Sequence, residues 1–174
     1  MDEAAVKQNA AQDYELNLTD GVRVTASGDP ASPVLKRFFE GYDRAFVLPD
    51  EREDLSGFET CLALNLTHRL AHGRTQCELV AVLETEGGDL LGGANFLATT
   101  IKRAGAPPAS VALNYIYVET AARGRGLMRQ ALSAVRRLAP AALDMASDAP
   151  PPALFIEQND PLRLTSDEYT EDTR

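Results

Sequence analysis

A loop that combines two glycines with two arginines has the residue types and spacing that point most directly to chemistry. Its six residues are Arg123, Gly124, Arg125, Gly126, Leu127 and Met128. Glycine has no Cβ, so the backbone at Gly124 and Gly126 can adopt unusual angles and approach phosphate oxygens closely. The arginines add cationic donors. An ordinary surface turn has a similar composition, so the elements on either side decide between these two interpretations.

Those flanking elements are a strand and a helix. Residues 111–118 form the strongest strand candidate of the chain, because β-branched and aromatic side chains dominate them. Residues 128–139 repeat apolar side chains at helical spacing, with arginines on the other side. The N-terminus of a helix presents unpaired backbone N–H groups and the positive end of the helix dipole. The order strand, loop, helix therefore predicts a diphosphate site that needs no metal.

The N-terminal third is expected to begin with a flexible arm through residue 20, since its first dozen residues are polar and alanine-rich. A short strand is expected at residues 22–25. An amphipathic helix follows, with Ser32 as N-cap and Pro33 at its first position. Residues 58–66 form a second, less regular apolar segment.

The middle of the chain favours a hairpin over residues 78–101, with its turn at Gly87-Gly88-Asp89. Gly92-Gly93 within it suggests a bend or a bulge. Another short apolar strand is expected at residues 153–157. The two strands of the hairpin and the strand at residues 111–118 are predicted to be three consecutive antiparallel strands. The fold class is thus α+β, a mixed, largely antiparallel sheet flanked by helices, in one domain over residues 1–174.

Composition limits the classes of partner and compartment. The formal net charge of −9 argues against a nucleic-acid surface, which needs clustered lysines and arginines, and favours a cationic or amine substrate. No apolar stretch approaches the roughly 20 residues that span a bilayer. The N-terminus lacks the basic and apolar regions of a signal peptide, and two cysteines make no disulfide framework. We therefore expect a cytoplasmic protein without a membrane partner.

With this loop and these flanking elements, the sequence resembles the GNAT superfamily of N-acetyltransferases. The family motif reads Gln/Arg-x-x-Gly-x-Gly/Ala between a strand and a helix, and here Arg123 and Gly126 match it. Met128 departs from the motif, because Gly or Ala is usual there. The order of elements from about Ser32 to Asn159 also agrees: helices, a hairpin, the motif-bearing strand and helix, then another strand.

The resemblance implies that acetyl-CoA is the co-substrate and that an amine is the acceptor. The backbone amides of residues 123–128 would bind the diphosphate. The pantetheine arm would lie along the strand at Ile116, Tyr117 and Val118, and Asn159 would touch the cofactor.

The same resemblance implies direct attack of the amine on the thioester, with a backbone N–H near Val118 as oxyanion donor. The strand at residues 111–118 contains no carboxylate that could act as the base. Glu157 is the best candidate for the base, with a water relay as the alternative. Tyr169 is the candidate that protonates the departing thiolate.

Three other interpretations of the sequence concern a metal site, a dinucleotide site and an inactive binding module. The spacing of Cys61, His68, His72 and Cys77 matches no common zinc site, so no metal is expected. A dinucleotide-binding unit lacks its third glycine, since Arg129 stands there. A catalytically inactive acyl-CoA-binding module on the same fold is favoured by Met128 and by the absence of an obvious base.

The C-terminus suggests an incomplete version of the fold. A capping box at residues 165–168 predicts a helix start, but the chain ends at Arg174 before the two further strands of a complete family member. The strand at residues 153–157 would then be an apolar edge, which would allow pairing into a homodimer. A fragment of a longer protein is an equally good explanation of this end.

Overall fold

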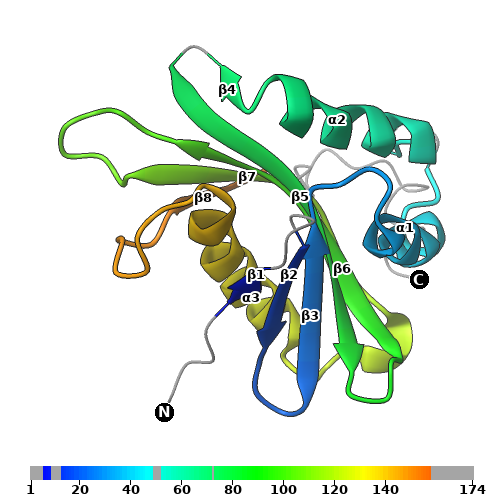
Figure 1. The fold of residues 1–174 in the computed structure, drawn as a ribbon. Coiled ribbons are helices and arrows are strands. Elements are labelled where there is room, and N and C mark those ends of the chain that lie inside the picture. Colours follow the sequence, from blue (N-terminus) through cyan, green and yellow to red (C-terminus); the bar gives the residue numbers. More distant parts are fainter. Residues whose placement is uncertain (1–5, 9–12, 49–51, 72, 158–174) are drawn as a thin grey trace, which may run out of the picture.

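The structure is a computed structural model that describes residues 6–8, 13–48, 52–71 and 73–157. A mixed sheet forms its centre (Figure 1). The strands are β1 (Lys7–Gln8), β2 (Asp13–Asn17), β3 (Val22–Ser27), β4 (Leu70–Ala71), β5 (Arg74–Thr85), β6 (Leu90–Thr100), β7 (Ala109–Val118) and β8 (Ala153–Ile156). Their order in the sheet is β1-β2-β3-β5-β6-β7-β8, with β4 paired to β5 beyond this path. Neighbours are antiparallel except β7 and β8, which are parallel. The predicted α+β class and largely antiparallel sheet are confirmed.

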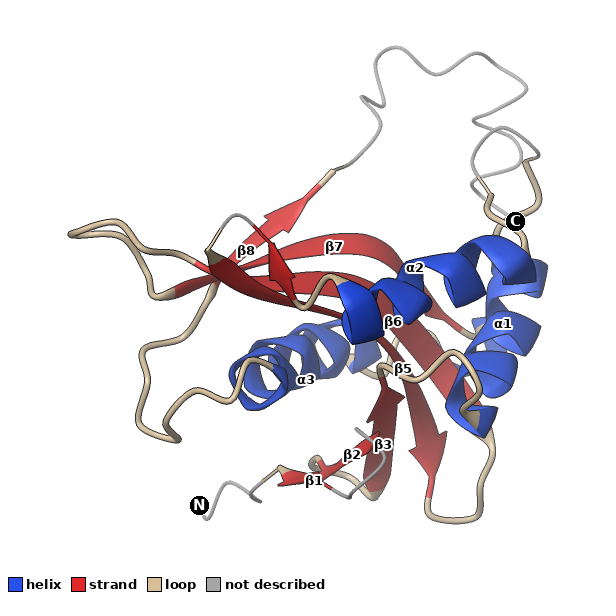
Figure 2. Cartoon of the chain, turned by 45° about the horizontal axis from the view of Figure 1, so that its top comes forward, coloured by secondary structure: helices blue, strands red, loops and turns tan. Residues whose placement is uncertain are grey.

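Helices cover both faces of the sheet (Figure 2). The helices are α1 (Pro33–Ala45), α2 (Leu55–Thr67), the short 3-10 turn η2 (Thr120–Ala122) and α3 (Leu127–Ala142). The alternation of side chains along β5 explains this division, because successive residues of a strand point to opposite faces. Leu79 and Ala81 belong to the core shared with α3, whereas Val80 and Val82 pack with α1 and α2.

The predicted start of α1 is confirmed. Ser32 is the N-cap, and its hydroxyl accepts a hydrogen bond from the Val34 amide at 3.3 Å. Leu35, Phe38 and Tyr42 then recur at helical spacing and are fully buried against the sheet. The less regular segment becomes α2, whose N-cap Asp54 accepts from the Gly57 amide at 2.8 Å.

The predicted hairpin is β5 and β6, and its bulge lies at Leu91. Leu83 pairs with Gly92 and Glu84 with Leu90, which leaves Leu91 as the extra residue. Gly93 serves a packing purpose, because a Cβ there would lie 2.9 Å from the Phe38 and Tyr117 rings. The glycine pair therefore lets α1 and β7 approach β6 closely.

The expectation of a flexible arm through residue 20 is wrong for residues 13–17. These residues form β2, which pairs with β3 in antiparallel register, and Tyr14 and Leu16 are buried. The period of two in Asp13–Asn17 is a strand signal, and the arm was inferred from average polarity rather than from this alternation.

The described chain ends just after β8. Phe155 and Ile156 are 62% and 52% exposed, so this strand is an apolar edge of the described sheet. Asn159, Tyr169 and the capping box at residues 165–168 lie outside the described residues. Over the described ranges, we find no helix long and apolar enough to cross a membrane.

The buried position of β2 gives a stability prediction. Leu16→Ala should lower the free energy of unfolding by about 2–5 kcal/mol, because it leaves a cavity in the core beneath β2. The neighbouring side chain of Glu15 is exposed, so Glu15→Ala should stay within about 0.5 kcal/mol of the parent. Urea unfolding measures both, and equal small effects would mean that β2 is not part of the cooperative fold.

Candidate functional site

The glycine loop adopts a backbone that explains both of its glycines. Gly124 has a φ of +76° and Gly126 a φ of +73°, in the left-handed region that side chains rarely occupy. A Cβ at either position would meet nothing within 4 Å, so the surface beside the loop is open. Gly126 is also the N-cap of α3. Local geometry therefore selects glycine here, and leaves space where a ligand can approach the backbone.

The start of α3 is suited to an anion. No side chain caps the helix at Gly126, and its first turn has no acidic residue, so the positive end of the dipole is not compensated there. Arg123 and Arg125 are exposed beside it, and the Arg123 Nε donates to the Val118 carbonyl at 3.4 Å. Leu127 is buried and anchors the helix, whereas Met128 is 44% exposed. The side chain of Met128 therefore lies outside the core.

A bulge in β7 creates an open stretch of strand next to this loop. Asn95 pairs with Tyr115 but Phe96 pairs with Leu113, so Asn114 is an extra residue. Pairing of β7 with β8 covers only Ser110 to Leu113 and ends just before the bulge. Residues 115–118 thus have β6 on one side and, within the described part of the chain, no strand on the other. An extended ligand could pair with that backbone.

The three residues predicted to contact pantetheine lie in this stretch, but their side chains differ. Ile116 and Val118 are partly buried against the core shared with α3. Tyr117 is buried on the opposite face, where its hydroxyl donates to the Phe38 carbonyl at 2.8 Å. Burial raises the pKa of Tyr117 well above its usual value, so this phenol stays protonated. Tyr117 can therefore offer a ligand its backbone rather than its ring.

A polar cluster crosses the face of the sheet that carries α1 and α2. The carboxylate of Glu78 on β5 accepts a hydrogen bond from the side-chain nitrogen of Asn95 on β6 at 2.9 Å. The side-chain oxygen of Asn95 accepts from the side-chain nitrogen of Asn114 at the bulge, at 3.0 Å. Glu78 is half-buried, Asn95 is buried and Asn114 is exposed, so the buried Asn95 connects the Glu78 carboxylate with the surface beside the bulge.

The backbone of Glu78 is fixed by a residue of α2. The Asn65 side-chain oxygen accepts from the Glu78 amide at 2.8 Å, and its nitrogen donates to the Glu78 carbonyl at 2.8 Å and the Gly28 carbonyl at 2.9 Å. Burial raises the pKa of the Glu78 carboxyl, and the hydrogen bond from Asn95 opposes part of that rise. A carboxylate held in this way is a candidate acid or base.

Sequence reasoning missed this cluster. Its members are separated by 17 and 19 positions along the chain, and only the register of three antiparallel strands brings them together. The available signal was a polar residue near the middle of each of three apolar strands, at Glu78, Asn95 and Asn114.

Aromatic rings border the bulge on the same face. The ring of Tyr115, the residue after Asn114, lies 4.9 Å from Tyr42 and 5.3 Å from Phe46 between centroids, in edge-to-face geometry. Phe58 of α2 completes the group at 5.7 Å from Tyr115. These contacts fix the C-terminal end of α1 and the N-terminal end of α2 over β7.

The remaining predicted residues have uneven support. Glu157 is exposed just beyond β8, and its role as base stays a prediction, while Asn159 and Tyr169 lie outside the described residues. Cys61 and Cys77 are free thiols whose pKa is raised by burial, so neither is an activated nucleophile. In the part of the chain that the structure describes, no three His, Cys, Asp or Glu side chains gather closely enough to hold a metal ion.

Comparison with known proteins gives matches among solved structures alone. No protein-family model matches the chain, and no curated protein matches it by sequence. An aminoglycoside acetyltransferase from an uncultured soil metagenomic sample, solved with sisomicin, is 14% identical, with 90% of this chain and 87% of that chain covered at a TM-score of 0.47. A ribosomal-protein-alanine N-acetyltransferase from Brucella melitensis biovar Abortus 2308 is 13% identical, with 86% of each chain covered at a TM-score of 0.46.

A putative GnaT-family acetyltransferase from Bordetella pertussis is 18% identical, with 72% of this chain and 73% of that chain covered at a TM-score of 0.38. All three neighbours are described as acetyltransferases. Their identities and scores are too low to carry an activity over to this chain.

The contacts of Asn65 give a prediction about the support of the site. Asn65→Ala should lower the free energy of unfolding by about 3 kcal/mol, because three hydrogen bonds are lost and buried backbone groups are left unpaired. Glu59→Ala, an exposed change on the same helix, should stay within about 0.5 kcal/mol. Thermal and urea unfolding would measure both changes in stability. If Asn65→Ala left the free energy of unfolding unchanged, α2 would not fix β5.

Proposed function

We propose that this chain is an N-acetyltransferase that transfers the acetyl group of acetyl-CoA to a primary amine of a small molecule or a protein. The observation that carries the proposal is the continuity between two features of β7. Its open backbone at residues 115–118 leads through η2 into the left-handed glycine loop at the start of α3. Such a path suits an extended thioester that has a diphosphate at its other end.

The loop residues fit the diphosphate for physical reasons. The amides of Gly124 to Met128 and the positive end of the α3 dipole would hold its oxygens, and Arg123 and Arg125 would balance its charge. The open space beside both glycines supports this fit. Acetyl-CoA would supply the activated acyl group. The backbone of Ile116, Tyr117 and Val118 would orient the pantetheine arm, and Asn159 keeps its predicted contact with the cofactor.

In the reaction, the chain mainly positions two reactants and moves protons. A backbone N–H near Val118 would stabilise the charge that develops on the carbonyl oxygen. Glu157 is one candidate for the base, with a water relay as the alternative, and Tyr169 is the candidate that protonates the thiolate.

Compartment and assembly belong to the same proposal. We place the protein in the cytoplasm, without a nucleic-acid or membrane partner. The exposed Phe155 and Ile156 on the edge strand β8 support pairing with a second copy. Sedimentation of the purified chain would decide between monomer and homodimer.

Two separate measurements test the function. Calorimetry should detect binding of CoA, and release of free thiol from acetyl-CoA should depend on an amine from a panel of peptide N-termini, lysine derivatives and aminoglycosides. Binding without thiol release on the whole panel would favour the inactive acyl-CoA-binding module. Absence of CoA binding would refute both the acetyltransferase and the inactive acyl-CoA-binding module.

Gly126→Val provides a sharper test of the loop. Loss of one or two charge-assisted hydrogen bonds, each worth about 1.5–3 kcal/mol, should weaken CoA binding by about tenfold or more. Gly105→Val is the matched control, because Gly105 also has a left-handed φ of +76° and open space around it but lies in the β6–β7 loop. Both variants should lose similar stability, whereas Gly105→Val should keep its affinity for CoA. Equal affinities in the two variants would remove the loop from the binding site.

A further inference from the structure

We propose that Glu78 takes the proton from the acceptor amine, and that Asn95 and Asn114 hold its carboxylate in position beside the bulge. This inference rests on the proposed N-acetyltransferase function and names the base for that reaction.

The position of the carboxylate is the first support. Glu78, Asn95 and Asn114 occupy three adjacent strands on one face, and two hydrogen bonds of 2.9 and 3.0 Å connect them. The cluster ends at the residue where β7 stops pairing with β8. The thioester would lie along β7 just beyond this point, so an amine that approaches it from the face of α1 and α2 meets this cluster.

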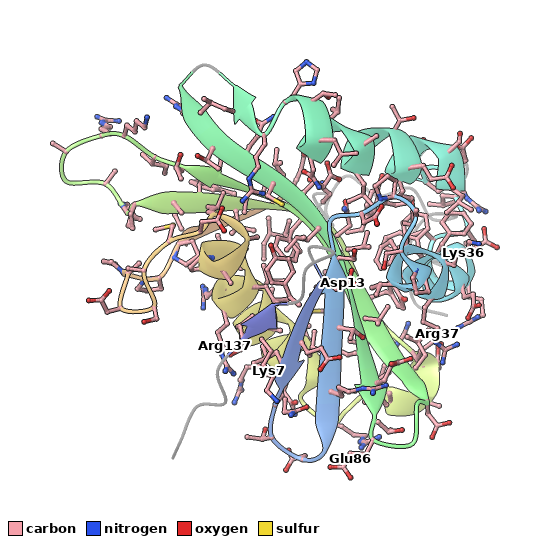
Figure 3. The ribbon with its side chains drawn as sticks, in the orientation of Figure 1. Lys7, Asp13, Lys36, Arg37, Glu86 and Arg137 are labelled. Carbon is pink, nitrogen blue, oxygen red and sulfur yellow. The ribbon has the colours of Figure 1, made fainter. Side chains whose placement is uncertain are left out.

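The charge environment of Glu78 is the second support. Two other glutamates near this face form ion pairs: Glu84, on the same strand, with Arg23 at 3.2 Å and Arg37 at 3.1 Å, and Glu119 with Arg44 at 2.6 Å. Arg37 projects from α1 near the β5–β6 turn (Figure 3), where it also donates to the Gly88 carbonyl.

Glu78 differs from both of these glutamates. Among the described residues, its carboxylate has the Asn95 amide as hydrogen-bond partner and no cation within ion-pair distance. A carboxylate without a cation is free to receive a proton, whereas an ion-paired one is held ionised.

Burial changes the pKa of the Glu78 carboxyl in the direction that favours a general base. It raises the pKa of Glu78 toward neutrality, and general bases work best when their pKa is near the working pH. The titratable neighbours are the Cys61 thiol of α2 and the Cys77 thiol of the same strand, and each has a pKa raised by burial first and by Glu78 in addition. Both thiols therefore stay neutral at neutral pH.

The acceptor arrives at the site as an ammonium ion. Its nitrogen gives one proton to the Glu78 carboxylate through intervening water, and the freed lone pair forms a C–N bond to the thioester carbonyl carbon. The C–S bond breaks with its electron pair on sulfur. The nitrogen then loses its second proton, which balances the proton that the thiolate takes up. An amide, the free thiol of CoA and a protonated Glu78 result, and Glu78 then returns its proton to solvent.

Glu78→Gln tests the inference, because the amide oxygen can still accept from Asn95 but cannot take the proton. We expect kcat/KM for the best amine of the panel to fall by about 100-fold, with CoA affinity unchanged within about twofold by calorimetry. In the parent, kcat/KM should rise with pH and level off above the pKa of Glu78. In the variant it should keep rising toward the pKa of the amine, because only the free amine reacts.

A readout without substrate accompanies the kinetics. Because the pKa of Glu78 is raised on folding, the parent should lose stability as pH rises through that folded-state pKa, and Glu78→Gln should not. The stability gained by the variant should thus grow as pH rises from below the ordinary glutamate pKa to above the raised folded-state pKa of Glu78. A constant difference would mean that the carboxylate is not perturbed, and would overturn the inference.

One control variant and one comparison complete the design. Glu59→Gln makes the same charge change at an exposed site on α2 and should keep the parent pH profile. Glu157→Gln removes the other candidate base, just beyond β8, and decides between the two carboxylates. The inference fails if Glu78→Gln keeps the profile or if Glu157→Gln loses it, while amine-dependent turnover by the parent would leave the proposed function intact. A parent that binds no CoA, or binds it without turnover on the panel, overturns this inference together with the proposed enzyme activity.

Discussion

The architecture of the site depends on one extra residue in β7. Asn114 interrupts the pairing with β6, and the described pairing of β7 with β8 ends at Leu113, just before it. A bulge bends its strand and redirects the side chains that follow. Here it sends Tyr115 and Tyr117 toward α1 and α2, and leaves the other backbone edge of residues 115–118 without a described strand. The open edge and the polar cluster thus have the same origin.

The strand beyond the bulge is held firmly by α1. The Tyr117 hydroxyl donates to the Phe38 carbonyl, Arg44 pairs with Glu119 at 2.6 Å, and a Cβ at Gly41 would overlap the Tyr117 ring. Such contacts keep the end of β7 in one position relative to the glycine loop. Reactants bound along β7 would therefore be aligned by a rigid element, which is the main requirement of a direct transfer.

The sequence was sufficient for the features that depend on local chemistry. Ser32 and Pro33 predicted the start of α1, and Gly126 predicted the loop before α3, because caps and left-handed angles are properties of single residues. It was insufficient for β2, where composition obscured the alternation of Tyr14 and Leu16. It could not place Glu78 beside Asn95 either, since that contact requires strand register, which a single sequence does not define.

Mapping CoA onto the backbone amides by NMR tests the central claim most directly. When the ¹⁵N-labelled chain is titrated with CoA, the largest shifts should occur at residues 124–128, followed by residues 115–118, and Gly126→Val should remove the first group. Shifts confined to other surfaces, or none at millimolar CoA, would contradict the assignment of the glycine loop as a diphosphate site.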